Sequence, residues 1–417
     1  MDFNLSKEQE LLSDSVQRFM AKEYGFEKRR AILRSPEGMS REVWAKLAEL
    51  GLLGLQVPEE HGGVGAGAVE SMLTMNAFGR GLLVEPYLSS AILATGLIRE
   101  LGSPNQKEKL LARLAAGELI AVPAHGEAGA RYDLGRVGTS AVPARDGFVL
   151  NGRKAVVLHA QSADLLLVSA RTGDGRSPQG AASKGGAGSP GDGRSPQGAA
   201  SKAGPGAPGT FDTGPGVSVF LVPRDAPGIT ILGYPTLDGQ RAADVILRDV
   251  RMPRDALLGP EGGALPVLSA VWDLGLAALC AEAVGALQAI FDATLEYTKS
   301  RKQFGVPIAK FQALQHRMAD MLMHVEQAKS MSYLAAVRCT DADARARSHA
   351  LSAAKVLVGQ ACRFVGQQAV QLHGGMGMTD ELIVSHHFKR LAVIELSLGD
   401  TEHHLERFVQ SAPPEGT

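Results

Sequence analysis

The sequence predicts an α+β protein, with an all-α domain at residues 1–118, a β-domain at 119–260 and a helical bundle at 261–417. Three patterns support this prediction. Apolar residues recur at helical spacing in the first part, and short β-rich runs between Gly, Pro and Asp turns fill the second. Long Ala-rich stretches of helical spacing fill the third. At 417 residues the chain is long enough for several cores and for burying a bulky cofactor.

The N-terminal domain is predicted from helix start signals. Ser6 and Gln9 have the spacing of a capping box, which satisfies the free backbone amides at the start of a helix. The apolar residues that follow share one helical face: Leu11, Leu12, Val16 and Phe19. Ser103 before Pro104 marks another helix start. The remaining helices of this domain are expected at 41–50, 67–80 and 88–101.

The β-domain is predicted from five β-rich runs, at 147–157, 165–168, 217–222, 229–232 and 244–250. It contains a low-complexity segment, 173–216, in which GDGRSPQGAASK occurs at 173–184 and again at 191–202. This segment has too little apolar area to offset the entropy of ordering, so we predict a disordered insertion in a β-hairpin loop. A regulatory or partner-binding role for the segment is the alternative.

Four long helices are predicted in the C-terminal part, at 265–300, 312–339, 343–373 and 380–409, which is the number and length typical of a four-helix bundle. The most apolar stretch, 265–291, is interrupted by three polar residues, Asp273, Glu282 and Gln288. These residues favour a buried bundle helix, so no membrane span is expected.

Composition argues against several classes of function. Lys plus Arg (43) nearly balances Asp plus Glu (44), so the chain lacks the positive field expected of a nucleic-acid-binding protein. The three cysteines, Cys280, Cys339 and Cys362, show no CxxC spacing and predict neither disulfides nor zinc. Adjacent histidines at 386–387 and 403–404 would diverge on a helix, so no metal site is expected. The N-terminus lacks a secretory pattern, and a cytoplasmic protein is therefore expected.

The first motif is RKQFG, residues 301–305, which lies between two predicted helices. The guanidinium of Arg301 beside a glycine turn suits a bidentate contact with a diphosphate. Phe304 offers a flat apolar wall, and the amide of Gln312 offers further hydrogen bonds. An ordinary helix end, with an arginine that complements the helix dipole and a glycine that stops the helix, is the alternative interpretation.

The second motif is QLHGGMGMTDE, residues 371–381. Gln371 is expected to end a helix, and the absence of a Cβ at Gly374 and Gly375 allows the backbone to approach a phosphate or nucleotide closely. A glycine-rich turn between helices is by itself more typical of a C-cap. Its combination with RKQFG favours a nucleotide site.

These motifs, together with three further stretches, resemble the acyl-CoA dehydrogenase family from end to end. The further stretches are FNLSKEQ at 3–9, LAELGLLGLQVPEEHGG at 47–63 and ADVILRDVRMPRDALLG at 243–259. Only 173–216 falls outside the resemblance. The fold that it implies has an N-terminal all-α domain, a central β-barrel-like domain and a C-terminal four-helix bundle.

The resemblance implies an FAD-dependent enzyme that introduces an α,β double bond into an acyl-CoA. A carboxylate would remove the α-proton while a hydride leaves Cβ for flavin N5. Six residues would contact FAD, some of them across a subunit interface: Arg301, Phe304, Gln312, Gln371, Gly374 and Gly375. The implied partners are an acyl-CoA substrate, other subunits of a tetramer, and an electron-transferring flavoprotein as electron acceptor.

The sequence departs from the family at the catalytic base. The usual glutamate falls on Leu398 or Gly399, depending on a one-residue shift of the alignment, and the alternative glutamate falls on Gly275. Three carboxylates lie near the first position: Glu395, Asp400 and Glu402. Asp400 is the nearest and is the candidate base. Such a base works best when burial raises its pKa, and the thioester carbonyl must be polarised by preorganised donors.

A second departure lies in the β-domain. The family's TEPxAGSD and WITN/SG segments, which face the flavin ring, match VPAHGEAGARYD at 122–133 and VVLHAQSAD at 156–164. Their threonine and tryptophan are absent here. His159 is the conspicuous polar residue in the second stretch. Either it donates to the flavin or a substrate, or it is an ordinary hydrogen-bonded histidine.

Three functions remain open from the sequence. The chain is an active homo-oligomeric acyl-CoA dehydrogenase with an unusual base, or it is the base-deficient, FAD-holding subunit of a heterotetramer with a homologous subunit. In the second case it resembles the small subunits of enzymes for dicarboxylic-acid or steroid side-chain thioesters. The third function is another flavin oxidation or a binding role. The missing glutamates at Gly275 and at Leu398 or Gly399 favour the second.

Overall fold

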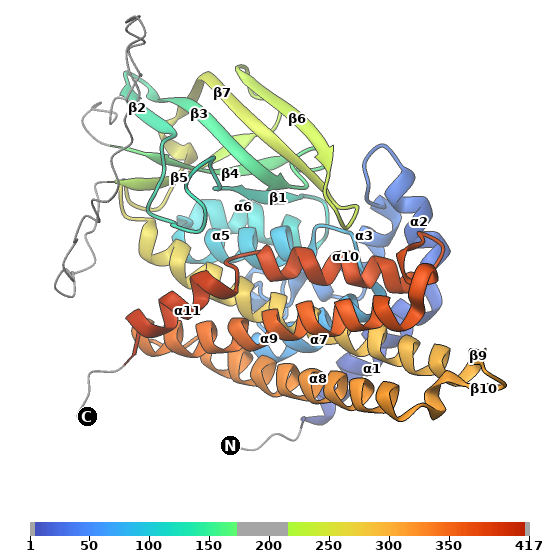
Figure 1. Ribbon diagram of the computed structural model, residues 1–417. Helices are drawn as coiled ribbons and strands as arrows, with labels where there is room; N and C mark the ends of the chain where they lie inside the picture. Colours follow the sequence, from blue (N-terminus) through green and yellow to red (C-terminus); the bar gives the residue numbers. More distant parts are fainter. Residues whose placement is uncertain (1–4, 173–215, 413–417) are drawn as a thin grey trace, which may run out of the picture.

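The computed structural model describes residues 5–172 and 216–412, so the predicted insertion lies almost entirely outside the described residues. Helices occupy the chain up to Ala115, strands lie between Ala121 and Leu258, and helices return from Leu265. Figure 1 shows the sheet stacked on the N-terminal helices, with the long C-terminal helices side by side beyond them. This arrangement confirms the predicted α+β class.

The N-terminal part is entirely helical, as predicted. Ser6 caps its first helix, since its hydroxyl accepts a hydrogen bond from the Gln9 amide at 3.2 Å and the Gln9 side chain accepts one from the Ser6 amide at 3.0 Å. Ser103 caps a later helix in the same way. The helices are α1 (Lys7–Glu23), α2 (Phe26–Arg34), α3 (Arg41–Glu49), α4 (Ala68–Gly81), α5 (Thr95–Leu101) and α6 (Pro104–Ala115). The short α2 was not predicted.

The segment 88–101 is helical, but it is not the single α-helix that was predicted. Its first half, η3 (Leu88–Ala94), is a π-helix, and only its second half is the α-helix α5. Two short 3-10 turns, η1 (Leu52–Gly54) and η2 (Glu59–His61), complete this part of the chain. A π-helical stretch of this length is rare and is often found at functional sites.

The β-domain is a mixed eight-stranded sheet with the order β6-β7-β3-β2-β4-β5-β8, and β1 pairs with β4 in parallel. In the described residues the order runs from β6 to β8 without closing into a ring. The five predicted strands are present, whereas the short β1 and β2 were not predicted. The strands are β1 (Ala121–Ala124), β2 (Ser140–Ala144), β3 (Gly147–Leu158), β4 (Leu165–Arg171), β5 (Val217–Pro223), β6 (Ile229–Pro235), β7 (Arg241–Pro253) and β8 (Leu257–Leu258), with the 3-10 turn η4 (Arg254–Ala256) between β7 and β8.

The C-terminal part begins with α7 (Leu265–Ser300), α8 (Gln312–Arg338) and α9 (Ala344–His373), close to the predicted bounds. A small hairpin of β9 (Lys302–Gln303) and β10 (Val306–Pro307), followed by the 3-10 turn η5 (Ile308–Lys310), joins α7 to α8. The 3-10 turn η6 (Gly374–Met378) follows α9. The hairpin projects from the end of the bundle away from the sheet (Figure 1).

The prediction of one continuous fourth helix at 380–409 is wrong. The chain forms α10 (Ile383–Leu396) and α11 (Thr401–Gln410), separated by a four-residue break. Leu398 and Gly399 have φ angles of 55° and 111°, which a continuing right-handed helix does not allow. The buried ammonium of Lys355 on α9 donates to the carbonyls of Glu395, at 2.8 Å, and Gly399, at 2.5 Å. These bonds satisfy carbonyls that a helix end leaves free.

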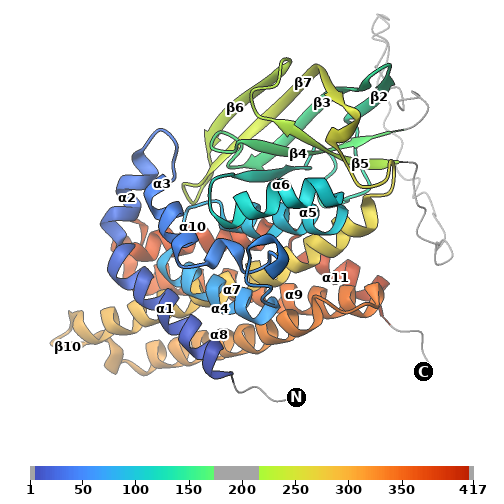
Figure 2. The same cartoon turned by 180° about the vertical axis from the view of Figure 1, so that it is seen from behind.

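The N-terminal part and the bundle share a core, because α4 and α7 approach each other backbone to backbone. A Cβ at Gly79 would lie 1.9 Å from the carbonyl oxygen of Glu282, and a Cβ at Gly285 would lie 1.9 Å from that of Asn76. The view from behind shows α4 alongside α7 (Figure 2). This contact fixes the position of Glu282, which lines the cavity described below.

Candidate active site

Gly275 and Leu398, two of the residues at the expected base positions, lie at one place in the fold. Cδ1 of Leu398 lies 3.5 Å from the point where a Cβ on Gly275 would stand. Cδ2 of Leu93, on η3, lies 2.5 Å from the same point. We call this contact of Gly275, Leu93 and Leu398 the apolar junction; none of the three residues has a side-chain group that can accept a proton.

Asp400, the candidate base, is the N-cap of α11. Its Oδ1 accepts a hydrogen bond from the His403 amide at 2.8 Å, and its Oδ2 lies 3.7 Å from the guanidinium of Arg131. Burial alone would raise the pKa of Asp400, but the His403 amide, Arg131 and the Tyr132 hydroxyl outweigh burial and hold the pKa below its usual value. A carboxylate stabilised in this way is a weak proton acceptor.

The two neighbouring carboxylates have other surroundings. Glu395 is buried, and its Oε1 accepts hydrogen bonds from the Arg363 guanidinium at 3.0 Å and from the Thr401 hydroxyl at 3.0 Å. It thereby ties the end of α10 to the start of α11. Glu402 is exposed in the first turn of α11, where a negative charge complements the helix dipole.

The six residues predicted to contact FAD gather at the far end of the bundle, and all six are exposed: Arg301, Phe304, Gln312, Gln371, Gly374 and Gly375. Tyr297, at the end of α7, stacks on His373 with ring centroids 4.3 Å apart, which brings the β9–β10 hairpin close to η6. The side chain of Phe304 is 92% exposed. Its ring lies edge-on to Phe311, with centroids 6.1 Å apart.

Two features leave these residues available to a ligand. The guanidinium of Arg301 forms no ion pair with another described residue. Around Gly374 and Gly375, a Cβ would find no other atom within 4 Å, and Gly374 has a φ of 61°. Exposed donors beside open backbone fit an anionic dinucleotide.

The base position and the cluster of dinucleotide residues lie far apart within one chain. Gly275 and Ser300, both on α7, are separated by 25 residues, or roughly 37 Å at the rise of an α-helix. One dinucleotide cannot span that distance. Arg301 and Phe304 therefore cannot reach a ligand bound beside Gly275 of the same chain.

The two divergent stretches of the β-domain lie on the side of the sheet that faces α7. His125 accepts or donates a hydrogen bond with the Ser169 hydroxyl at 2.9 Å, and its ring meets Trp272 of α7 edge-on, with centroids 5.2 Å apart. Lys154 is fully buried, 2.7 Å from Glu127 and 2.9 Å from Ser169, and burial lowers its pKa to about 8. His125, Glu127, Lys154 and Ser169 thus form a hydrogen-bonded network at the first divergent stretch.

His159 does not match the interpretation as an ordinary hydrogen-bonded histidine. Its side chain is 2% exposed, and its Nδ1 has no hydrogen-bond partner among the described residues. Burial, together with the charge of Arg390, lowers its pKa to about 4, so the ring is neutral at physiological pH. A buried, unpaired imidazole nitrogen is costly unless a ligand or water satisfies it.

An ion-pair network beside His159 connects three regions of the chain and was not predicted. Arg390 on α10 donates to both carboxylate oxygens of Glu282 on α7, at 2.6 and 2.8 Å, and to Asp238 before β7 at 2.7 Å. Burial alone would lower the pKa of Arg390, but the two carboxylates outweigh burial and raise it. No spacing rule connects residues this far apart in sequence, and each taken alone resembles a surface charge.

The described residues were also compared with the requirements of a metal site and of a membrane span. Within 5–172 and 216–412, no group of three or more His, Cys, Asp and Glu side chains is placed to hold a metal ion. One helix in this part of the chain, α7, has the length and apolarity of a membrane span, but 89% of its most apolar window is buried inside the protein. Core helices commonly have this property.

Sequence comparison matches both ends of the chain to one family. The acyl-CoA dehydrogenase N-terminal domain matches residues 6–118, and the acyl-CoA dehydrogenase C-terminal domain matches 267–412. The probable acyl-CoA dehydrogenase YngJ of Bacillus subtilis is 30% identical over 407 residues, which cover 96% of this chain and 97% of that protein. The L-prolyl-[peptidyl-carrier protein] dehydrogenase of Serratia is 27% identical over the full length of both chains.

Solved structures share the fold. An acyl-CoA dehydrogenase from Geobacillus kaustophilus superposes with a TM-score of 0.83 at 24% identity, covering 98% of this chain and 99% of that chain. A variant of the Tcur3481-Tcur3483 steroid ACAD superposes with a TM-score of 0.79 at 26% identity, covering 97% of each chain. The two domain matches and the full-length relative at 30% identity establish that this chain belongs to the acyl-CoA dehydrogenase family, a family of oxidoreductases.

Proposed function

We propose that this chain is an FAD-holding subunit of an enzyme that introduces an α,β double bond into an acyl-CoA, and that a homologous partner subunit supplies the catalytic glutamate. The observation that carries this proposal is the apolar junction of Gly275, Leu398 and Leu93. Removal of a weakly acidic α-proton needs a base within hydrogen-bonding reach, and misplacement by an ångström is costly.

The exposed end of the bundle fits the cofactor. Arg301, with its guanidinium free of ion pairs to the described residues, would bind the diphosphate, and the open backbone at Gly374 and Gly375 would pass beside the nucleotide. Phe304 would pack against it, and the amides of Gln312 and Gln371 would donate further hydrogen bonds. FAD bound in this way supplies a hydride acceptor for the thioester Cβ.

The distance along α7 supports an oligomer. Arg301 lies roughly 37 Å from the junction at Gly275, so its dinucleotide serves the junction of another subunit. The partner is either a second copy or a homologue with a glutamate at one of the two base positions. The similar solved structure named for Tcur3481 and Tcur3483 supports the second possibility, because its name pairs two polypeptides.

Asp400 remains the candidate base for the alternative, an active homo-oligomer. It lies two residues after Leu398, but its carboxylate caps α11 and its pKa is lowered. To reach a substrate it would have to release the His403 amide. This arrangement favours the base-deficient subunit over the homo-oligomer.

The experiment compares the purified homo-oligomer with the protein captured from its native host. Anaerobic bleaching of bound FAD by a panel of acyl-CoA substrates should be slow or absent for the homo-oligomer. Co-purification should yield a homologous subunit with a glutamate at either base position, and the complex should bleach rapidly. Electron-transferring flavoprotein is the proposed acceptor, tested by reoxidation of the reduced complex.

Two variants keep the alternative open to test. Fast bleaching by the wild-type homo-oligomer that Asp400→Asn abolishes would establish Asp400 as the base, while Glu395→Gln serves as the matched control. Fast bleaching that survives both substitutions would place the base elsewhere. A flavin oxidation of another class would show as bleaching by a substrate that is not a thioester, and carrier-protein thioesters belong in the panel for the same reason.

A further inference from the structure

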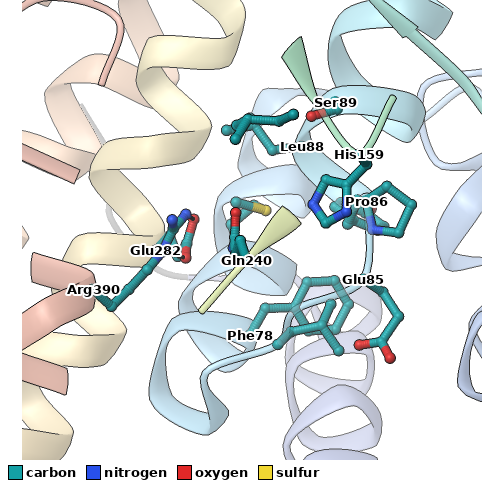
Figure 3. Close-up of a pocket in the computed structure, with 13 residues that line it drawn as sticks. Phe78, Glu85, Pro86, Leu88, Ser89, His159, Gln240, Glu282 and Arg390 are labelled. Carbon is teal, nitrogen blue, oxygen red and sulfur yellow. Dashed lines mark hydrogen bonds and ion pairs between the residues drawn. The ribbon is translucent and has the colours of Figure 1, made fainter. Parts of the chain in front are cut away.

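A small cavity lies between the N-terminal helices, the sheet and the bundle, about 30 Å³ in volume. Polar groups at its wall come from separate elements: Ser89 of η3, His159 after β3, Gln240 before β7, and the Glu282–Arg390 pair. Figure 3 shows Gln240 between His159 and that ion pair, with Leu88 and Ser89 together at one end. Glu85 and Tyr87 also line the cavity, and the rest of the wall is apolar: Met75, Phe78, Leu83, Pro86, Leu88 and Leu158. A few polar groups therefore converge on a largely apolar space.

His159 gives the cavity a hydrogen-bonding group that no described residue satisfies. Its Nδ1 is unpaired among the described residues, although the side chain is only 2% exposed. The ring is neutral, so its two nitrogens comprise one donor and one acceptor. The Gln240 side chain also contains both a donor and an acceptor. A ligand in the cavity can therefore accept one hydrogen bond and donate another, whichever nitrogen of His159 carries the proton.

The Glu282–Arg390 pair at the cavity is already neutralised. Both carboxylate oxygens of Glu282 accept from Arg390, and the third bond of Arg390 goes to Asp238. Glu85 also lines the cavity; burial raises its pKa, and its Oε2 has no hydrogen-bond partner among the described residues. No unpaired positive charge remains for an anionic ligand group, whose desolvation would be costly. A neutral group that both donates and accepts, such as a hydroxyl, matches this wall. About 30 Å³ holds a group of that size but no further chain.

The cavity is in line with the apolar junction where the base is missing. Glu282 follows Gly275 by seven residues on α7, which places both on one face, roughly 10 Å apart. On the facing π-helix, Leu93 contacts the Gly275 position, and Leu88 and Ser89 line the cavity. The interface between α7 and η3 thus runs from the reaction position to the cavity.

We propose that the cavity binds a hydroxyl group at the far end of the substrate's acyl chain, so that this protein acts on medium-chain acyl thioesters that carry a distal hydroxyl. The inference rests on the proposed function, because it assumes that the thioester binds beside Gly275 and Leu398. His159 and Gln240 then determine specificity, and neither takes part in proton or hydride transfer.

The test measures binding without turnover. The FAD-loaded protein is titrated in a calorimeter with two reaction products, oct-2-enoyl-CoA and 8-hydroxyoct-2-enoyl-CoA. The hydroxylated compound should bind at least tenfold more tightly, or about 1.4 kcal/mol. His159→Leu should abolish the preference while FAD content stays unchanged.

Two further variants distinguish the loss of cavity polarity from a general effect of replacing a buried histidine. His159 has a φ of 59°, where leucine adds strain, so Gln240→Leu provides an independent loss of cavity polarity. His387→Leu is the matched control, because His387 is equally buried with an unpaired Nδ1 but does not line the cavity. It should retain the preference.

The outcomes separate the two proposals. Equal binding of both compounds by the wild type, or an unchanged preference in both His159→Leu and Gln240→Leu, would overturn the cavity assignment and leave the proposed function intact. If neither thioester binds at all, the proposed function is overturned, and the inference with it.

Discussion

Cδ1 of Leu398 lies 3.5 Å from the position of a Cβ on Gly275, although the two residues are 123 positions apart in the chain. Gly275 is one expected position of the family's catalytic glutamate, and Leu398 is one of two alternatives for the other. Because the two residues meet in the fold, a glutamate at either position would reach the same place.

Leu398→Glu should create a working base in the homo-oligomer. Leu398 is only partly buried and packs against the hydrophobic core, so its surroundings should raise the pKa of the new carboxylate toward the value that suits a general base. We expect anaerobic bleaching by acyl-CoA to accelerate by about 10²-fold or more. Leu398→Gln, equal in size but uncharged, should stay slow. Equal rates for the two variants would contradict the assignment of this site.

Arg301→Ala should weaken FAD binding without unfolding the bundle, since the guanidinium is exposed at the end of α7. A charge-assisted hydrogen bond to the diphosphate is worth about 1.5–3 kcal/mol. The flavin absorbance that remains after dialysis measures the FAD still bound. It should fall in Arg301→Ala and not in a variant of a neighbouring charge. Lys299→Ala, which removes an exposed charge from the same helix, should retain FAD. Full retention of FAD by Arg301→Ala would remove that residue from the site.

Deletion of residues 174–212 should leave the fold and FAD binding intact. The strands on either side of the segment are joined directly, because the Thr172 amide donates to the Gly216 carbonyl at 2.7 Å and the hydroxyls of Thr172 and Ser218 are 2.7 Å apart. The four residues that remain suffice to connect a hairpin. Closing a shorter loop costs less entropy, by about 0.6 kcal/mol per halving, so the melting temperature should hold or rise. A large fall, or loss of flavin, would assign the segment a structural role.

Stability should fall as the pH drops below about 6.5, because three buried histidines are neutral in the folded protein. Burial lowers the pKa of His159 to about 4 and the pKa values of His387 and His404 to about 3. Between these values and 6.5 the unfolded chain binds more protons, which favours unfolding by roughly 1.4 kcal/mol per pH unit for each histidine. Melting temperatures from pH 7 to pH 4 should show this slope. His387→Leu should make the slope shallower, and an unchanged slope would exclude His387 as a contributor.

The elements that could be predicted from the sequence are those with local causes. Ser6 and Ser103 cap helices through residues three positions away, and the runs at 147–157 and 165–168 are rich in residues that favour strands. The family motifs are likewise short and contiguous, so RKQFG and QLHGG could be read directly. The strand β1 was missed because only four residues carry its pattern. The helix α2 follows Gly25 and has no side-chain cap, whereas the equally long α3, which was predicted, is capped by Ser40.

Tertiary structure decided what depends on residues distant in sequence. Lys355, from another helix, supplies the hydrogen bonds that stabilise the break before Asp400, and the sequence around Leu398 contains no sign of that partner. The same holds for the pairing of Arg390 with Glu282 and for the unpaired nitrogen of His159. A sequence specifies local hydrogen bonds and hydrophobic periodicity, whereas the burial of a charge or an imidazole is set by what packs around it. The family and its cofactor motifs were therefore evident from the sequence, but the apolar junction and the polar cavity in line with it emerged only once α7, η3 and α10 were placed together.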